Sequence, residues 1–223
     1  MNGSIDAGPV SRAAAPQCAT GRPWCRLCRR PGVNCYCSTI EPFDSTPLFV
    51  ILVHPREAKH RLGTARMAHR VLRNSRLLEG VDFSRNRWVN QAIENPANAP
   101  LLLFPGLDAV NLTKIGALER CALLTGSRMP LVFVPDGTWR TARKMLRLSD
   151  NLKQLPKICF DPPAPSAYGF RREPRAECLS TIEAIHRVIE LFNVDDGDQA
   201  QRGGRLLAPF RFMVAAQLAR KPS

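Results

Sequence analysis

Long apolar runs are missing from this chain of 223 residues; LFVILV at 48–53 is among the longest. A transmembrane helix needs about 20 consecutive apolar residues, so the sequence predicts no membrane span. The first twenty residues lack the charged and then apolar pattern of a secretory signal, and they are too poor in arginine for a typical transit peptide. We therefore expect a soluble, cytoplasmic protein.

Fingerprints of several common enzyme classes are also absent. G-x-G-x-x-G and G-x-x-x-x-G-K-[ST] do not occur, which removes the usual signals for dinucleotide and nucleoside-triphosphate binding. The G-x-S-x-G turn of α/β-hydrolases and the H-E-x-x-H of zinc proteases are missing as well. Nothing in the sequence supports a Ser-His-Asp hydrolase.

Acidic residues are scarce relative to basic ones. The chain has 32 lysines and arginines and 19 aspartates and glutamates, a net charge of 32 − 19 = 13, and its pI is near 10.1. Such an excess attracts polyanions, of which nucleic acid is the most common in the cytoplasm. The charge by itself also fits a ribosome-associated or merely basic protein.

The eight cysteines are unevenly distributed. Four of them form two close pairs within CRLCRRPGVNCYC: Cys25, Cys28, Cys35 and Cys37. Disulfide scaffolds belong to secreted proteins, whereas two thiolate pairs joined by a tight turn suit tetrahedral zinc. We predict a flexible tail at 1–20 and a zinc knuckle at 21–40, with four incidental reduced thiols as the alternative.

Apolar patterning predicts the regular elements. Continuous apolar runs indicate strands at 48–53, 101–106, 130–134 and 157–160, and a shorter one at 87–91. Apolar residues at helical spacing indicate helices at 60–78, 108–125, 138–148, 180–192 and 206–220, and 195–205 is expected to be a loop. Ser180 and Glu183 have the spacing of a capping box.

Apolar strands that alternate with helices are typical of a mostly parallel sheet covered by helices on both faces. In such sheets ligands bind outside the carboxyl ends of the strands. The segments that follow the strands here are LFPG (103–106), VPDGTW (134–139) and CFDPPAPSAY (159–168). We therefore expect a ligand pocket with the DGTW loop in its wall.

Three motifs occur in order along the chain: D-G-T-W-x-x-A-R-K-M at 136–145, S-x-Y-x-x-R-x-x-P at 166–174 and L-S-T-x-E-A at 179–184. With these motifs, the cysteine knuckle and the H-P-R-E segment at 54–57, the chain resembles the DTW-domain family of S-adenosylmethionine-dependent tRNA-uridine aminocarboxypropyltransferases. The resemblance extends over about residues 24–192. It departs at HRLGTARMA (60–68), where many relatives have an N-T-G-like stretch.

The resemblance implies a catalytic domain at 41–223 with a SPOUT-like fold, in which a carboxyl-terminal knot holds the cofactor. It also implies the reaction: the 3-amino-3-carboxypropyl group of S-adenosylmethionine moves to N3 of a uridine in tRNA, and methylthioadenosine leaves. tRNA is then the partner, and no obligatory protein partner is evident.

Asp136 is the candidate catalytic residue of this reaction. Uridine N3 is a weak acid, so a carboxylate beside it would act as a base or at least orient the ring. The alternative is that Asp136 forms a turn or the N-cap of the helix that starts near 138.

The cofactor is expected to contact Trp139 through adenine stacking or a cation–π contact with the sulfonium. Gly137 would let the backbone approach closely. Neighbouring loops would form the wall of the pocket opposite Trp139 and would hold the amino-acid end or the adenine edge of S-adenosylmethionine. The remaining predicted cofactor contacts are Leu103, Phe104, Gly106, Thr138, Leu179, Ser180 and Thr181.

Aromatic and basic residues are expected to bind the RNA. Tyr168 would stack on the target uracil, and the Arg171 guanidinium would bind the cofactor carboxylate or a tRNA phosphate. A basic stripe on one helix face suits phosphate binding, although a solvated face is the default interpretation of such a pattern: Arg140, Arg143, Lys144 and Arg147.

Two other functions fit parts of the sequence. A SPOUT-type RNA methyltransferase would use the same cofactor and the same kind of substrate. A non-catalytic zinc-knuckle RNA-binding protein would explain the charge and the cysteines, but it leaves Asp136 and Trp139 without a purpose.

Overall fold

A parallel β-sheet forms the centre of the protein. The computed structural model describes residues 24–58, 63–123, 128–167, 179–194 and 197–219. Within these residues six strands pair in the order β2-β1-β5-β3-β6-β4, every pair parallel. The strands are β1 (Leu48–Val53), β2 (Arg76–Glu79), β3 (Asn98–Leu103), β4 (Val110–Asn111), β5 (Met129–Asp136) and β6 (Lys157–Cys159).

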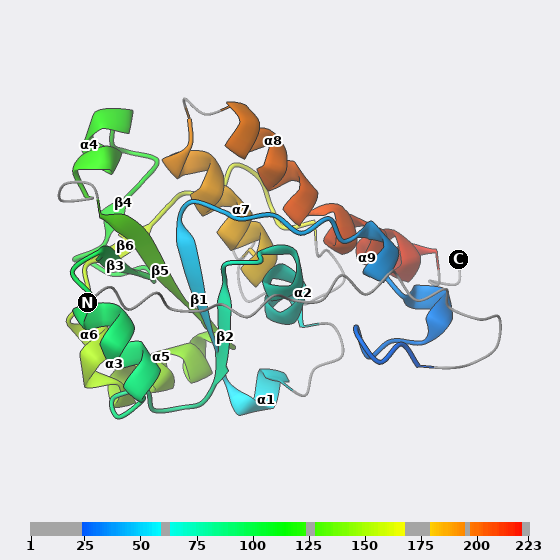
Figure 1. The fold of residues 1–223 in the computed structure, drawn as a ribbon, viewed down its shortest axis with the longest axis horizontal. Coiled ribbons are helices and arrows are strands. Elements are labelled where there is room, and N and C mark those ends of the chain that lie inside the picture. Colours follow the sequence, from blue (N-terminus) through cyan, green and yellow to red (C-terminus); the bar gives the residue numbers. More distant parts are fainter. Residues whose placement is uncertain (1–23, 59–62, 124–127, 168–178, 195–196, 220–223) are drawn as a thin grey trace, which may run out of the picture.

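Helices cover both faces of the sheet (Figure 1). One face carries α3 (Arg87–Glu94), α5 (Trp139–Leu148) and α6 (Asp150–Lys153). The other face carries α2 (Thr64–Val71), α7 (Thr181–Phe192), α8 (Gly197–Leu206) and α9 (Ala208–Leu218). The short helices α1 (Pro55–Ala58) and α4 (Ala117–Ala122) follow strands β1 and β4.

Each central strand contributes to both hydrophobic layers. In β1, Phe49 and Ile51 pack with α2 and α7, whereas Val50 and Leu52 pack on the opposite face with α3 and α5. Side chains of a strand point alternately to the two faces, so a strand covered on both sides must be apolar throughout. This is why LFVILV and PLVFV read as continuous apolar runs, and why the α/β prediction is confirmed.

Several predicted elements match the structure. The strands at 48–53, 101–106, 130–134 and 157–160 correspond to β1, β3, β5 and β6, and the helices at 138–148 and 180–192 correspond to α5 and α7. The helix predicted at 206–220 is α9. The predicted capping box is also present: Glu183 accepts the Ser180 amide at 2.8 Å, and Ser180 caps the helix.

Two predicted assignments near the sheet edge were wrong. Residues 87–91 form the start of helix α3 rather than a strand, because the Asn86 side chain accepts the Val89 amide at 3.0 Å and caps a helix. In the predicted helix at 60–78, only α2 is helical among the described residues, and Arg76–Leu78 belong to strand β2, which pairs with β1.

Two further assignments were wrong for local reasons. In the predicted helix at 108–125, Asn111 ends strand β4 and its side chain accepts the Thr113 amide at 3.0 Å, so α4 is the helical part of the residues that the structure describes here. The segment at 195–205, expected to be a loop, contains most of α8. An Asp198–Arg202 ion pair one turn apart and the buried Leu206 support that helix.

Among the described residues, no helix combines the length and the apolar character that crossing a bilayer requires.

The helical state of residues 197–206 leads to a stability prediction. A Cβ added at Gly204 meets no atom within 4 Å, and alanine restricts the unfolded chain more than glycine does. We expect Gly204→Ala to raise the free energy of unfolding by about 0.5–1 kcal/mol in urea denaturation. A decrease would mean that this position needs a glycine-specific backbone, as a loop would.

Candidate active site

The carboxyl ends of β1 and β5 lie side by side at one edge of the sheet. In the β1–β5 register Val53 is opposite Asp136, the last residue of β5. Directly after β1, the His54 amide donates to the Asp136 carbonyl at 3.0 Å. The buried His54 ring accepts the Arg56 amide at 3.2 Å through Nδ1, so it stabilises the turn into α1. This pairing fixes the backbone of Asp136.

The Asp136 side chain contacts a residue 45 positions away in the chain. Its Oδ1 accepts a hydrogen bond from the Thr181 hydroxyl in the first turn of α7. The D-G-T-W and L-S-T-x-E-A motifs therefore meet at one point. The N-cap of α5 is Thr138, whose hydroxyl accepts the Thr141 amide at 3.2 Å. The alternative in which Asp136 caps that helix is thus contradicted.

Gly137 lies where there is no room for a side chain. A Cβ at this position would be 2.5 Å from the Thr141 hydroxyl oxygen, which also lies 3.0 Å from the Thr138 hydroxyl. The glycine therefore permits the tight start of α5. Gly106 is similarly confined, because a Cβ there would be 2.8 Å from an Asp108 carboxylate oxygen.

Trp139 and Phe104 form the aromatic part of the site. Their ring centroids are 5.8 Å apart at an interplanar angle of 63°, an edge-to-face contact. The contact connects the segment that follows Leu103 at the end of β3, which includes Gly106, to the first residue of α5. Trp139 is 39% exposed, so part of its indole surface is accessible to a ligand.

Glu183 organises the start of α7. It accepts the Ser180 amide at 2.8 Å, the Ser166 hydroxyl at 2.7 Å and the Ala167 amide at 2.9 Å. Leu179 is half-buried and Ser180 is buried. The segment after β6 and the first turn of α7 are thus held together beside Asp136.

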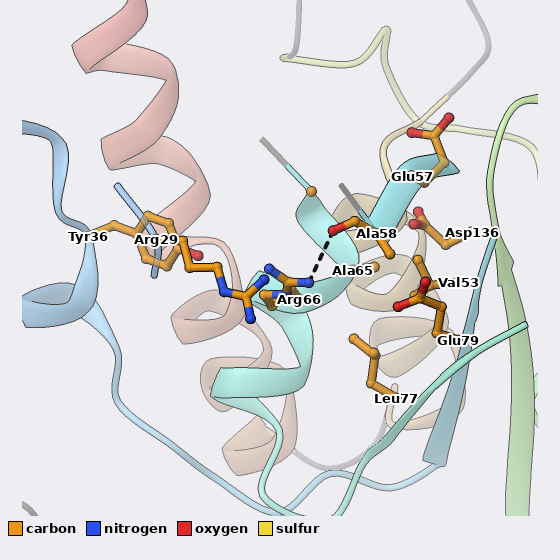
Figure 2. Close-up of a pocket in the computed structure, with 11 residues that line it drawn as sticks. Arg29, Tyr36, Val53, Glu57, Ala58, Ala65, Arg66, Leu77, Glu79 and Asp136 are labelled. Atoms are coloured by element: carbon orange, nitrogen blue, oxygen red, sulfur yellow. Dashed lines mark hydrogen bonds between the residues drawn. The ribbon is translucent and has the colours of Figure 1, made fainter. Parts of the chain in front are cut away.

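A cavity of about 110 Å³ opens at the β1–β2–β5 edge. Figure 2 shows carboxylates on one side of it and two guanidinium groups on the other. The acidic residues are Glu57, Glu79 and Asp136, and the basic residues are Arg29 and Arg66. Arg66 is oriented by a hydrogen bond of 3.1 Å from Nη2 to the Ala58 carbonyl.

Comparison with known proteins identifies the kind of domain. The model of the DTW domain matches residues 22–218. The chain belongs to the DTW-domain family. No solved structure gives a match.

The chain is also similar to curated proteins of three eukaryotes. It is 28% identical over 205 residues to tRNA-uridine aminocarboxypropyltransferase 2 of Mus musculus, an alignment covering 90% of this chain and 65% of that protein. The Drosophila melanogaster protein of the same name is 30% identical over 166 residues, covering 71% and 62%. tRNA-uridine aminocarboxypropyltransferase A of Arabidopsis thaliana is 26% identical over 216 residues, covering 86% and 80%. The chain spans slightly less than two thirds of the mouse and fly relatives.

The cysteine cluster of this DTW domain has the geometry of a metal site. The four Sγ atoms lie within 4.8 Å of one another, and the Cys25–Cys37 and Cys28–Cys35 sulfur pairs are each 3.7 Å apart. Disulfide sulfurs are about 2.05 Å apart, whereas Zn–S bonds of about 2.3 Å in a tetrahedron separate sulfurs by about 3.8 Å. The donor set therefore fits zinc.

The thiols differ in how readily they lose a proton. Burial raises the pKa of Cys28 to about 11 and also raises that of Cys37. For Cys25, burial acts in the same direction, but hydrogen bonds from the Cys28 and Leu27 amides outweigh it and lower the pKa to about 6. Metal binding at this cluster must therefore release protons.

The cysteine knuckle packs into the main core of the DTW domain. Cys25, Cys28 and Tyr36 belong to the same buried cluster as β1, α2 and α7. The Arg70 side chain from α2 donates to the Leu27 carbonyl at 2.9 Å. Because Arg29 and Tyr36 also line the cavity, the knuckle forms one of its walls (Figure 2).

The basic stripe lies on the outer face of α5. Arg140, Arg143, Lys144 and Arg147 are exposed, while Ala142, Met145 and Leu146 face the core. The stripe begins beside Trp139 and follows the helix away from the site.

Two predicted RNA contacts, Tyr168 and Arg171, lie outside the described residues. Sequence reasoning in turn missed two cavity residues. Glu57 was visible only as the end of the H-P-R-E segment. Glu79 follows directly on a segment assigned to a helix, so its position at the end of a strand was not recognised.

Metal content tests the cysteine site. We expect purified protein to contain about one zinc ion per chain by elemental mass spectrometry, and Cys28→Ala to contain almost none and to unfold at a lower temperature. Cys159→Ala is the control, because this thiol ends β6 outside the cluster. Unchanged zinc content in Cys28→Ala would exclude the four-thiolate site.

Proposed function

We propose that this protein transfers the 3-amino-3-carboxypropyl group of S-adenosylmethionine to N3 of a uridine in tRNA and releases methylthioadenosine. The hydrogen bond between Thr181 and Asp136 carries the proposal, because it brings two family motifs together at the carboxyl edge of a parallel sheet. Relatives named tRNA-uridine aminocarboxypropyltransferase support the same activity.

The proposed reaction assigns a proton-accepting role to Asp136. The N3–H proton of uridine passes to the carboxylate. N3 then forms a bond to the carbon of the aminocarboxypropyl group that is attached to the sulfonium sulfur, and the bond between that carbon and sulfur breaks with its electron pair on sulfur. Thr181 donates to one carboxylate oxygen and so fixes the orientation of the base. A carboxylate has about four lone-pair positions, of which the Thr181 hydroxyl occupies one.

The other predicted contacts surround this point. The accessible part of Trp139 and the adjoining Phe104 would hold the adenosine, together with Leu103, Gly106, Gly137, Thr138 and the Leu179–Thr181 turn. The exposed stripe Arg140–Arg143–Lys144 would bind tRNA phosphates. Tyr168 is proposed to stack on the target uracil, and Arg171 is proposed to bind the cofactor carboxylate or a tRNA phosphate.

The finer features of the fold are part of the same proposal. A SPOUT-like knot would bring the carboxyl-terminal chain back to the middle of the sheet. The position of α7 supports this. In the chain α7 follows β6, which is separated from β5 by β3 in the sheet, yet α7 packs against β5 and α2.

We further propose that the knuckle at 21–40 binds structural zinc and that residues 41–223 form the catalytic domain after the tail at 1–20. We also propose that the enzyme acts in the cytoplasm.

Nucleoside mass spectrometry tests the reaction. Unmodified tRNA incubated with the protein and S-adenosylmethionine should yield a uridine heavier by one aminocarboxypropyl group, together with methylthioadenosine. A methylated nucleoside with S-adenosylhomocysteine would identify a methyltransferase instead. No modification of any tRNA, combined with intact RNA binding, would favour the non-catalytic RNA-binding protein.

Asp136→Asn tests the proposed base. The amide has nearly the same shape but accepts a proton poorly, so the turnover rate should fall about 10²- to 10⁴-fold, while tRNA affinity in a filter-binding assay stays within about twofold. The control is Asp150→Asn, a loss of the same charge at an exposed position paired with Lys153. A near-normal rate for Asp136→Asn would limit Asp136 to orienting the uracil.

A further inference from the structure

The cavity at the β1–β2–β5 edge has charges of both signs in its wall. Glu57 comes from α1, Glu79 from the end of β2 and Asp136 from the end of β5. Opposite them, Arg66 belongs to α2 and Arg29 to the cysteine knuckle. In the view of Figure 2 the carboxylates and the guanidinium groups occupy different sides.

Glu79 forms no direct ion pair with either arginine of the cavity. No ion pair within 4.0 Å joins Glu79 to Arg66 or to Arg29, although all three are among the described residues. Arg66 uses one N–H on the Ala58 carbonyl, and a guanidinium has five N–H donors. Each side of the cavity therefore retains capacity to bind a ligand group of the opposite charge.

A zwitterion matches this arrangement better than a neutral base does. An α-amino acid carries an ammonium and a carboxylate on one carbon, so it can satisfy both sides at once, and hydrogen bonds between charged groups are roughly twice as strong as neutral ones. A neutral uracil offers no charge to either Glu79 or Arg66.

We infer that this cavity binds the zwitterionic amino-acid tail of the donor, with Glu79 and Glu57 on its ammonium and Arg66 on its carboxylate. The inference rests on the proposed function and extends it to residues that the motifs do not include. Asp136 connects the two parts of the site, because it lines the cavity and directly precedes the Gly137–Trp139 turn. The adenosine then lies on the Trp139 side, and the tail reaches toward β2.

The position of Arg29 gives the knuckle a part in this subsite. Arg29 has a left-handed backbone, with φ of 54°, in the turn closed by its amide on the Cys25 carbonyl at 2.8 Å. The cysteine knuckle therefore places a second cation at the basic side of the cavity.

Two ligands, one with the amino-acid tail and one without it, distinguish binding of the tail from binding of the adenosine. S-adenosylhomocysteine has the amino-acid tail and does not react, whereas methylthioadenosine lacks the tail. Using isothermal titration calorimetry, we expect Glu79→Gln to weaken S-adenosylhomocysteine binding roughly tenfold or more and to leave methylthioadenosine binding within about twofold. Arg66→Gln should show the same selectivity.

Glu94→Gln is the matched control, because it removes the same charge at an exposed position on α3, which packs on the other face of the sheet. Thermal unfolding of each variant verifies that it is folded. If a folded Glu79→Gln binds both ligands as the wild type does, or loses both equally, the tail subsite is refuted while the proposed function stands. A raised KM for tRNA with unchanged S-adenosylhomocysteine binding would assign the cavity to the uracil and refute the inference. If the wild type binds neither ligand, the proposed function and the inference fail together.

Discussion

The hydrogen bond from Thr181 to Asp136 is the contact on which the candidate site depends. Asp136 ends the central strand β5, and Thr181 begins α7, so the bond ties the carboxyl edge of the sheet to the helix layer above it. The Glu183 hydrogen bonds hold the start of that helix, and the β1–β5 register holds the strand. Each partner is thus positioned by structure that does not involve a ligand, and the role proposed for Asp136 requires such preorganisation.

The cysteine knuckle contributes to the same site from the opposite direction. Its buried residues share one core with β1, α2 and α7, and its turn supplies Arg29 and Tyr36 to the cavity wall. A metal bound there would stabilise more than a peripheral module. Loss of such a metal would weaken the packing of α2 and move a cation at the edge of the cavity, so stability and ligand binding would be coupled through the knuckle.

The sequence predicted the parts of the fold that repeat a simple pattern. Strands β1 and β5 are buried on both faces, so their apolar runs were unambiguous, and a parallel sheet implies ligands at the carboxyl edge, where Asp136 lies. It failed where local capping or packing decides the outcome: Asn86 caps a helix that reads as a strand, and packing makes the glycine-rich α8 helical. The apolar periodicity also could not show whether Asp136 or Thr138 is the N-cap of α5. Both are good N-cap residues, and both lie within three residues of the first helical residue, Trp139. Glu79 escaped notice because β2 is a short edge strand with charged ends.

The parallel topology also determines when the site can exist during synthesis of the chain. Strand β1 pairs with β5 through Leu48 and Leu131, which are 131 − 48 = 83 positions apart, and Thr181 follows Asp136 by 45 positions. Such non-local pairing forms slowly because long loops must close first. On a ribosome, Asp136 and Thr181 meet only after the start of α7 has emerged from the exit tunnel. The nascent protein therefore carries its basic α5 surface before it has an assembled site beside it.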